Sequence, residues 1–356
     1  MHSLKGALEL EDGSVFSGIS FGAEKSIAGE VVFNTGMVGY PESLTDPSYS
    51  GQILCLTYPL IGNYGVPKWE KDEFSIEKRF ESGKIHISGL IVCNYSEQYS
   101  HWQAAKSLGE WLKEEGIPAI TGIDVRALTK LLREKGTMLG RINLGKEVEF
   151  YDPNKINLVE KASIEEPITY GKKGEKILLI DCGAKNNIVR SLLKRNCTVT
   201  KVPWNFKMEK DFDFDGVVIS NGPGDPKQCG ETITLIKEVI AKEIPTFGIC
   251  LGNQLLALAA GADTYKLKYG HRSQNQPAVL AGEKRCFITS QNHGFAVDEK
   301  TLPKDWESWF TNLNDGSNEG IRHKTKPFCS VQFHPEAWPG PVDTGFLFDE
   351  FLKELE

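Results

Sequence analysis

The chain of 356 residues lacks several features that would assign it to a class of protein at once. It has no excess of basic residues: 41 Lys and Arg stand against 48 Asp and Glu, and the net charge of −7 argues against a protein that binds nucleic acid. Apolar runs are short, such as residues 255–260, so no membrane-spanning helix is predicted. The first residues have no apolar core of the kind found in secretory signals.

Two kinds of local motif are also missing. None of the eight cysteines forms a CxxC pair, which indicates reduced thiols in a cytoplasmic protein rather than a disulfide framework. Neither G-x-G-x-x-G nor G-x-x-x-x-G-K-[ST] occurs, so no nucleotide-binding loop is predicted. We therefore expect no metal and no cofactor in this chain.

The length predicts two domains, and the pattern along the chain divides in the same way. Residues 1–145 are predicted to form a mixed α/β domain that opens with a hairpin around the turn Asp12-Gly13. Its other predicted elements are strands at 29–33, 52–57, 86–93 and 137–143 and helices at 102–115 and 124–134. Periodicity fades over 146–173, which indicates a linker.

Residues 174–356 alternate between predicted strands and helices. The strands are expected at 176–181, 198–202, 216–220, 245–249, 286–289 and 328–333, and the helices at 185–195, 232–242, 252–260 and 343–355. The continuous apolar run at 176–181 is typical of a parallel strand covered on both faces. The pattern predicts an α/β domain with a mainly parallel sheet flanked by helices.

The most informative motif lies at 245–262, where an apolar strand runs into Gly248-Ile249-Cys250-Leu251-Gly252 and a helix follows at once. This is the layout of a nucleophile elbow, G-x-Nuc-x-G, with cysteine as the nucleophile. Glycine on both sides permits the tight turn, and the N-terminus of the next helix stabilises a thiolate at Cys250. The alternative is a buried cysteine that only connects a strand to a helix.

Two further motifs supply what a cysteine nucleophile needs. His334 and Glu336 follow an apolar strand, and an imidazole that serves a cysteine needs a carboxylate to orient it. An H-x-E pair also occurs in zinc deaminases, but their P-C-x-x-C motif is absent here. The loop 220–226 places Gly222 and Gly224 after another strand, either as an oxyanion hole of backbone N–H groups or as an ordinary tight turn.

In this order, the Gly-Pro-Gly loop, the cysteine elbow and the H-P-E motif resemble the class I glutamine amidotransferases over 174–356. The strings TYKLKYGHRSQNQP, TSQNHGFAV and NDGSNEGIRH are similar to the amidotransferase part of carbamoyl phosphate synthetases. The strings at 29–54, 58–65 and 122–142 resemble the domain that precedes it in the small subunits of that family. The resemblance therefore spans nearly the whole chain.

The resemblance implies a role for each matching residue. Cys250 would be the nucleophile, His334 the acid and base, and Glu336 the carboxylate that orients the imidazole. The backbone N–H groups of Leu251 and Gly224 would face the developing oxyanion. The substrate glutamine would be held by Ser48, Gly222, Gly224, Leu251, Gln254, Asn292, Gly294 and Phe295.

The implied reaction is hydrolysis of glutamine, with ammonia delivered to a large synthetase subunit. That partner would bind ATP, Mg and bicarbonate and make carbamoyl phosphate for arginine and pyrimidine biosynthesis. One alternative is another class I amidotransferase, serving anthranilate, GMP or CTP synthesis, which the extended N-terminal domain argues against. The other is a scaffold without activity, which the intact Cys250, His334 and Glu336 argue against.

One departure and three histidines complete the sequence expectations. Asn253 stands where many relatives have histidine in C-L-G-H-Q, a change expected to alter neighbouring hydrogen bonds or partner contacts. His293, in the string QNHG, is expected either to touch substrate or to belong to a turn. His271 and His323 are expected on the surface.

Overall fold

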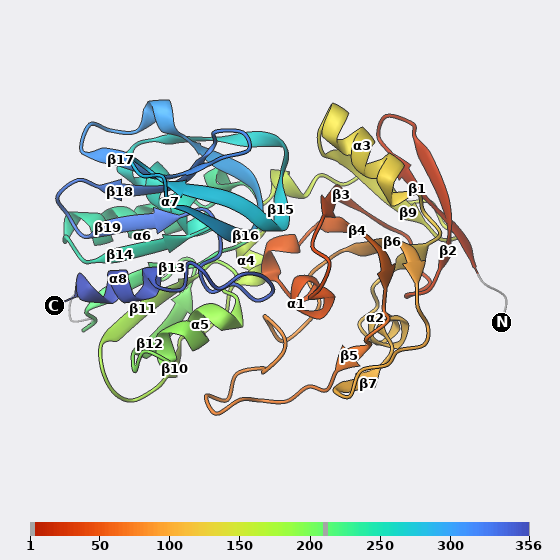
Figure 1. Ribbon diagram of the computed structural model, residues 1–356, viewed down its shortest axis with the longest axis horizontal. Helices are drawn as coiled ribbons and strands as arrows, with labels where there is room; N and C mark the ends of the chain where they lie inside the picture. Colours follow the sequence, from red (N-terminus) through yellow and green to blue (C-terminus); the bar gives the residue numbers. More distant parts are fainter. Residues whose placement is uncertain (1–3, 209–212, 356) are drawn as a thin grey trace. The chain divides into compact units, whose positions relative to one another are not determined.

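The structure is a computed structural model that describes residues 4–208 and 213–355. The chain divides into two compact units (Figure 1), of which one comprises Met1–Asp72 with Glu77–Asn154 and the other Glu73–Ile76 with Lys155–Glu356. The division falls after Asn154, so residues 155–173 of the predicted linker pack in the C-terminal unit. No helix in the described ranges is both long enough and apolar enough to cross a membrane.

The N-terminal unit is built around a closed barrel with the strand order β1-β2-β8-β6-β4-β3-β9. Its strands are β1 (Lys5–Leu10), β2 (Val15–Ser20), β3 (Ile27–Asn34), β4 (Gln52–Ile61), β6 (Gly89–Tyr95), β8 (Ala119–Thr121) and β9 (Met138–Asn143). The helices are α1 (Tyr40–Leu44), α2 (Leu108–Glu114) and α3 (Val125–Lys135), and β5 (Val66–Pro67) pairs with β7 (Ala104–Lys106) outside the barrel. The predicted hairpin is confirmed, because β1 and β2 pair antiparallel around the Asp12-Gly13 turn.

One predicted helix of this unit is wrong in its first turns. The helix expected at 102–115 begins only at Leu108, and residues 104–106 form the strand β7 instead. Ser107 fixes the start, because its hydroxyl accepts from the N–H of Glu110 while the Glu110 carboxylate accepts from the N–H of Ser107. The predicted helix at 124–134 is confirmed as α3, with Asp124 as its N-cap.

The C-terminal unit is a ten-stranded sheet with the order β10-β12-β11-β13-β14-β19-β18-β17-β15-β16. The strands β11 (Lys176–Asp181), β12 (Thr198–Pro203), β13 (Gly216–Ile219), β14 (Thr246–Ile249) and β19 (Phe328–Val331) pair parallel in its centre. The strands β10 (Ile168–Tyr170), β15 (Asp263–Leu280), β16 (Cys286–Asp298), β17 (Trp306–Asn312) and β18 (Asn318–His323) pair antiparallel. The predicted α/β domain is confirmed, and its sheet is parallel in the centre as expected, whereas five of its ten strands pair antiparallel on the two sides.

Helices cover both faces of the parallel strands (Figure 1). They are α4 (Val159–Ala162), α5 (Asn186–Leu193), α6 (Gly230–Ala241), α7 (Leu251–Ala260) and α8 (Leu347–Lys353). Apolar residues of α5 and α8 pack in one core with Leu179 and Phe247, whereas those of α6 and α7 pack in a second core with Leu178 and Ile180. Successive side chains of β11 therefore point into the two cores in turn, and α7, which follows Cys250, packs against one face of this sheet.

Short 3-10 turns lie at Pro47–Tyr49 (η1), Pro153–Lys155 (η2), Pro226–Gln228 (η3) and Glu299–Thr301 (η4).

The sequence did not predict β15, whose eighteen residues form a long hairpin with β16. Its polar run is interrupted by shifts of register between Lys266 and His271 and between Ser273 and Gln276, which disrupt the period-two pattern. Pairing with β16 and β17 stabilises this strand where local pattern alone is weak.

Candidate active site

Cys250 lies at the turn between β14 and α7, as the elbow motif predicts. Its backbone has φ 56 and ψ −103, a region that non-glycine residues rarely adopt. A hydrogen bond from the Cys250 N–H to the Val331 carbonyl, 2.8 Å, ties the turn to β19. The thiol is buried, and it sits at the N-terminus of α7, where the helix dipole favours a negative charge.

Close packing explains the glycines around this turn. A Cβ atom on Gly252 would lie 2.2 Å from the Ile219 carbonyl oxygen, so no larger residue fits beneath the elbow. On the adjacent loop, a Cβ on Gly222 would lie 2.1 Å from the Cys182 carbonyl oxygen and 2.7 Å from Leu251 Cδ2. The loop after β13 therefore reaches the first residue of α7 only because Gly222 has no side chain.

His334 and Glu336 follow β19 and form a buried pair, with His334 Nδ1 2.7 Å from Glu336 Oε1. A third charged group, Lys185, which the sequence analysis missed, lies beside this pair, so that Lys185, Glu336 and His334 form a buried row of charged groups. The ammonium of Lys185, just before α5, lies 3.1 Å from Glu336 Oε1 and donates to the Ala337 carbonyl at 2.6 Å. Asn187 Nδ2 also donates to the Glu336 carbonyl, which holds the H-P-E segment against α5.

The electrostatics of this group favour an imidazolium at His334 beside the Glu336 carboxylate. Burial of His334 opposes its charge, but the Glu336 carboxylate and the Cys250 sulfur outweigh burial and raise the pKa of His334 to about 10. Burial also opposes the charge of Glu336, but Lys185 and His334 lower the pKa of Glu336 to about 2. Nε2 of His334 is buried and has no hydrogen-bond partner within the described residues, so it is open for proton transfer.

Several residues that the resemblance assigned to glutamine lie around the Cys250 turn. The Cys250 thiol lies 3.7 Å from the Asn292 carbonyl oxygen, and Gln254 Nε2 donates to the Phe295 carbonyl at 2.9 Å. These contacts place β16, which also carries Gly294, against the start of α7. Gly222, in the loop after β13, packs beside Leu251 as described above.

For two of the predicted glutamine-binding residues, Gly224 and Ser48, the structure gives contacts within their own units. Gly224 has φ 86, and a Cβ atom on it would lie 3.4 Å from side-chain atoms of Leu158. Ser48 belongs to the N-terminal unit, in η1, where its N–H donates to Asp46 Oδ1 at 2.9 Å. Its assignment to the glutamine site stays a prediction from the resemblance.

Asn253 belongs to a buried polar network behind the elbow. Its Nδ2 donates to Gln332 Oε1 at 3.2 Å, and Ser330 donates to its Oδ1 at 2.8 Å. Gln254 donates to the same Gln332 oxygen at 3.1 Å. The asparagine is therefore satisfied by β19 and the residue that follows it, which supports the expected effect on neighbouring hydrogen bonds.

The surface position predicted for His271 is wrong. His271 is buried on β15, and it lies near His293 on β16 and Glu319 on β18. Two carboxylates, those of Asp315 and Glu319, compensate the burial of this imidazole, and no local pattern in the sequence marks that encounter. His323, in contrast, is half-buried at the end of β18.

Comparison with known proteins agrees with both units. The family model described as carbamoyl-phosphate synthase small chain, CPSase domain, matches residues 8–142, and that for glutamine amidotransferase class-I matches residues 178–354. The carbamoyl phosphate synthase arginine-specific small chain of Neurospora crassa is 54% identical over 357 residues, which are 98% of this chain and 79% of that protein. This chain belongs to the carbamoyl phosphate synthase small-chain family.

Two further curated relatives and one solved structure are also similar to this chain. The arginine-specific small chain of Saccharomyces cerevisiae is 52% identical over 98% of this chain and 88% of its own length. The multifunctional protein CAD of Squalus acanthias is 56% identical over 97% of this chain, which spans only 16% of that protein. A solved glutamine amidotransferase of Thermotoga maritima aligns with 52% of this chain and 85% of its own, at 23% identity and a TM-score of 0.39.

Membership of this family settles the class of protein. The chain is a glutamine-hydrolysing carbamoyl phosphate synthase small chain, with a class I amidotransferase domain after its CPSase domain. Amidotransferases that serve anthranilate, GMP or CTP synthesis are excluded, because the match to the CPSase domain covers the N-terminal unit.

Proposed function

We propose that Cys250, His334 and Glu336 form the catalytic triad with which this chain hydrolyses glutamine. The observation that carries the proposal is the buried row of alternating charge, Lys185, Glu336 and His334, which raises the pKa of His334 and leaves its Nε2 open near the Cys250 turn. A row of this kind would store the proton of the thiol on the imidazole and leave a thiolate as nucleophile.

The proposed first half-reaction runs as follows. The Cys250 thiolate attacks the carboxamide carbon of glutamine, and the carbonyl oxygen becomes an oxyanion held by the N–H groups of Leu251 and Gly224. The His334 imidazolium then gives its Nε2 proton to the amine as the C–N bond breaks, so ammonia leaves and a glutamyl thioester remains.

The second half-reaction restores the enzyme. Neutral His334 takes a proton from water, the resulting hydroxide attacks the thioester carbon, and the C–S bond breaks to release glutamate. Glu336 stays ionised throughout and keeps Nδ1 of His334 protonated, so that Nε2 carries out each transfer. Ser48, Gly222, Gly224, Leu251, Gln254, Asn292, Gly294 and Phe295 would hold the glutamine.

The ammonia would pass to a large synthetase subunit in a hetero-oligomer. ATP, Mg and bicarbonate would bind to that subunit, and the product would be carbamoyl phosphate made in the cytoplasm. The names of the fungal relatives, arginine-specific small chains, favour supply of arginine biosynthesis over pyrimidine biosynthesis. Copurification of a large synthetase chain with this one from its own cells would test the partnership.

The direct test is the glutaminase activity of a Cys250→Ser variant. A hydroxyl in this site lacks a base strong enough to ionise it, so we expect turnover to fall by at least about 10⁴-fold. Cys286→Ser is the matched control, since Cys286 is exposed and outside the site, and it should keep full activity. Substantial activity in Cys250→Ser would exclude the triad, and an inactive wild-type chain, alone and with its partner, would favour the scaffold alternative.

A further inference from the structure

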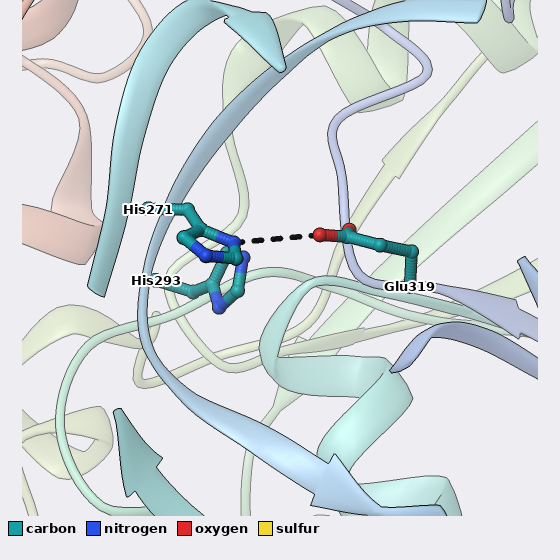
Figure 2. A group of neighbouring side chains, drawn as sticks. All are labelled: His271, His293 and Glu319. Carbon is teal, nitrogen blue, oxygen red and sulfur yellow. Dashed lines mark ion pairs between the residues drawn. The ribbon is translucent and has the colours of Figure 1, made fainter. Parts of the chain in front are cut away.

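A second group of charged and polar side chains is buried in the C-terminal unit, separate from the proposed triad. Figure 2 shows the rings of His271 and His293 beside the carboxylate of Glu319. One ring nitrogen of each histidine and one oxygen of Glu319 lie within 4.8 Å of one another, and all three residues are buried. The proposed reaction uses none of these groups.

His271 is anchored on one side by carboxylates. Its Nε2 lies 2.8 Å from Asp315 Oδ2 and its Nδ1 3.4 Å from Glu319 Oε1, while Asn312 donates to the same Glu319 oxygen at 2.8 Å. Burial opposes a charge on the imidazole, but the two carboxylates outweigh burial and raise the pKa of His271 to about 9. The ring is therefore held in place by charge as well as by hydrogen bonds.

On its other side, His271 begins a chain of short contacts along β16. His271 Nδ1 lies 3.0 Å from Gln291 Oε1, and the same oxygen lies 3.1 Å from His293 Nε2. The opposite ring nitrogen of His293, Nδ1, lies 2.8 Å from the Phe295 carbonyl oxygen. The two imidazoles meet edge to face, with ring centroids 4.9 Å apart.

This chain ends on the residues that surround Cys250. The Phe295 carbonyl also accepts from Gln254 on α7, and the Asn292 carbonyl faces the Cys250 thiol. Residues 291–295, called here the thiol-facing segment, therefore contact both the elbow and the His271 group. A shift of His271 would therefore be passed to this segment through Gln291 and His293.

We propose that His271 is a positioning residue: it fixes the thiol-facing segment against Cys250, acting through Gln291 and His293. The proposal rests on the proposed function, since it assigns to His271 the alignment of the glutamine site rather than a chemical step. The ring nitrogens of both histidines already face protein atoms at hydrogen-bond distance, so a proton on His271 balances the carboxylates without a metal ion.

The first experiment separates KM from kcat for glutamine hydrolysis. His271→Leu removes the contacts of both ring nitrogens, with Gln291 and with Asp315. The KM for glutamine should rise by roughly tenfold to a hundredfold, because the thiol-facing segment aligns the substrate. The kcat should change little, because His334 is untouched. Asp315→Asn keeps the shape but removes the charge and should show a smaller effect in the same direction. His101→Asn, on an exposed histidine, is the control and should behave as wild type.

The pH dependence gives a readout that simple loss of packing would not change. The titratable groups that face His271 are Asp315, Glu319 and His293, and the charge of Arg272 acts on His293 in turn. Deprotonation of His271 removes one of its two N–H groups, so the wild-type KM should rise as the pH approaches about 9. His271→Asn keeps one donor and one acceptor but does not titrate, so its KM should lack this rise.

Hydrogen exchange keeps this test separate from that of the proposed function. If the wild-type chain hydrolyses no glutamine, faster amide exchange of residues 291–295 in His271→Leu would still support the positioning role. An active wild type with unchanged KM and unchanged exchange in His271→Leu and Asp315→Asn would overturn it. One zinc ion per chain in elemental analysis of the purified protein, lost in His271→Asn, would also overturn it, because the group would then be a metal site.

Discussion

Two buried imidazoles of the C-terminal unit, His334 and His271, stand in closely similar electrostatic surroundings and yet are suited to different work. Each is buried, and neighbouring groups raise the pKa of the imidazole far above its ordinary value: Glu336 and the Cys250 sulfur raise that of His334 to about 10, and two carboxylates raise that of His271 to about 9. His271 has a partner at hydrogen-bond distance from both ring nitrogens, whereas the Nε2 of His334 has none among the described residues.

The difference lies in where the backbone places each histidine and which groups surround its ring nitrogens. His334 sits after the end of β19, beside the turn that places the buried Cys250 at the N-terminus of α7. His271 sits within the β15–β16 hairpin, where Gln291 and Asp315 fill the space around the ring. A raised pKa alone therefore gives no reason to assign catalysis to a histidine; the proposal for His334 also rests on a ring nitrogen that has no partner among the described residues and lies close to the proposed nucleophile Cys250.

The largest effect on glutaminase kcat should come from removing Nε2 of His334. His334→Asn deprives the thiol of its base and the leaving ammonia of its proton, so we expect glutaminase kcat to fall by about 10³-fold or more. Glu336→Gln only loosens the imidazole and should be roughly tenfold to a hundredfold less damaging. Steady-state kinetics of both variants decides the order, and a Glu336→Gln enzyme that is more impaired than His334→Asn would contradict the assigned roles.

A smaller effect is expected at Lys185, the charge that distinguishes the His334 group. Lys185→Met leaves Glu336 buried without its cation, so the carboxylate should hold the imidazole less firmly and kcat should fall by roughly tenfold to a hundredfold. Lys201→Met is a useful control, because Lys201 pairs with Asp181 elsewhere on the same sheet. Wild-type kinetics in Lys185→Met would show that Lys185 does not contribute to the orientation of His334.

The smallest effect concerns stability and pH. Because the pKa of His334 is raised to about 10, the stability that its pairing contributes is fully present below about pH 6.5 and is lost as the pH rises toward 10. The melting temperature of the wild type should therefore fall more steeply between pH 7 and about 10 than that of His334→Gln, measured by calorimetry. Parallel curves for the two proteins would show that the pair does not stabilise the fold.

The sequence predicted the His334 group much better than the His271 group, and the reason is physical. The Cys250 elbow and the H-P-E motif are local: each needs a strand end, small residues and a few neighbours in the chain. Lys185 and His271, in contrast, meet partners that are distant in the sequence. Glu336 lies 151 positions after Lys185, and Asp315 lies 44 positions after His271. Such pairings depend on strand register, and β15 has two register shifts that local periodicity does not reveal.

The most direct test of the central claim is the rate at which iodoacetamide alkylates each cysteine, followed by mass spectrometry. A thiolate sustained by His334 should make buried Cys250 react before exposed Cys286, glutamine should slow that reaction, and His334→Asn should abolish the preference. If Cys286 reacts first, or if neither glutamine nor the loss of His334 changes the labelling of Cys250, the paired thiolate and imidazolium on which the account depends do not exist.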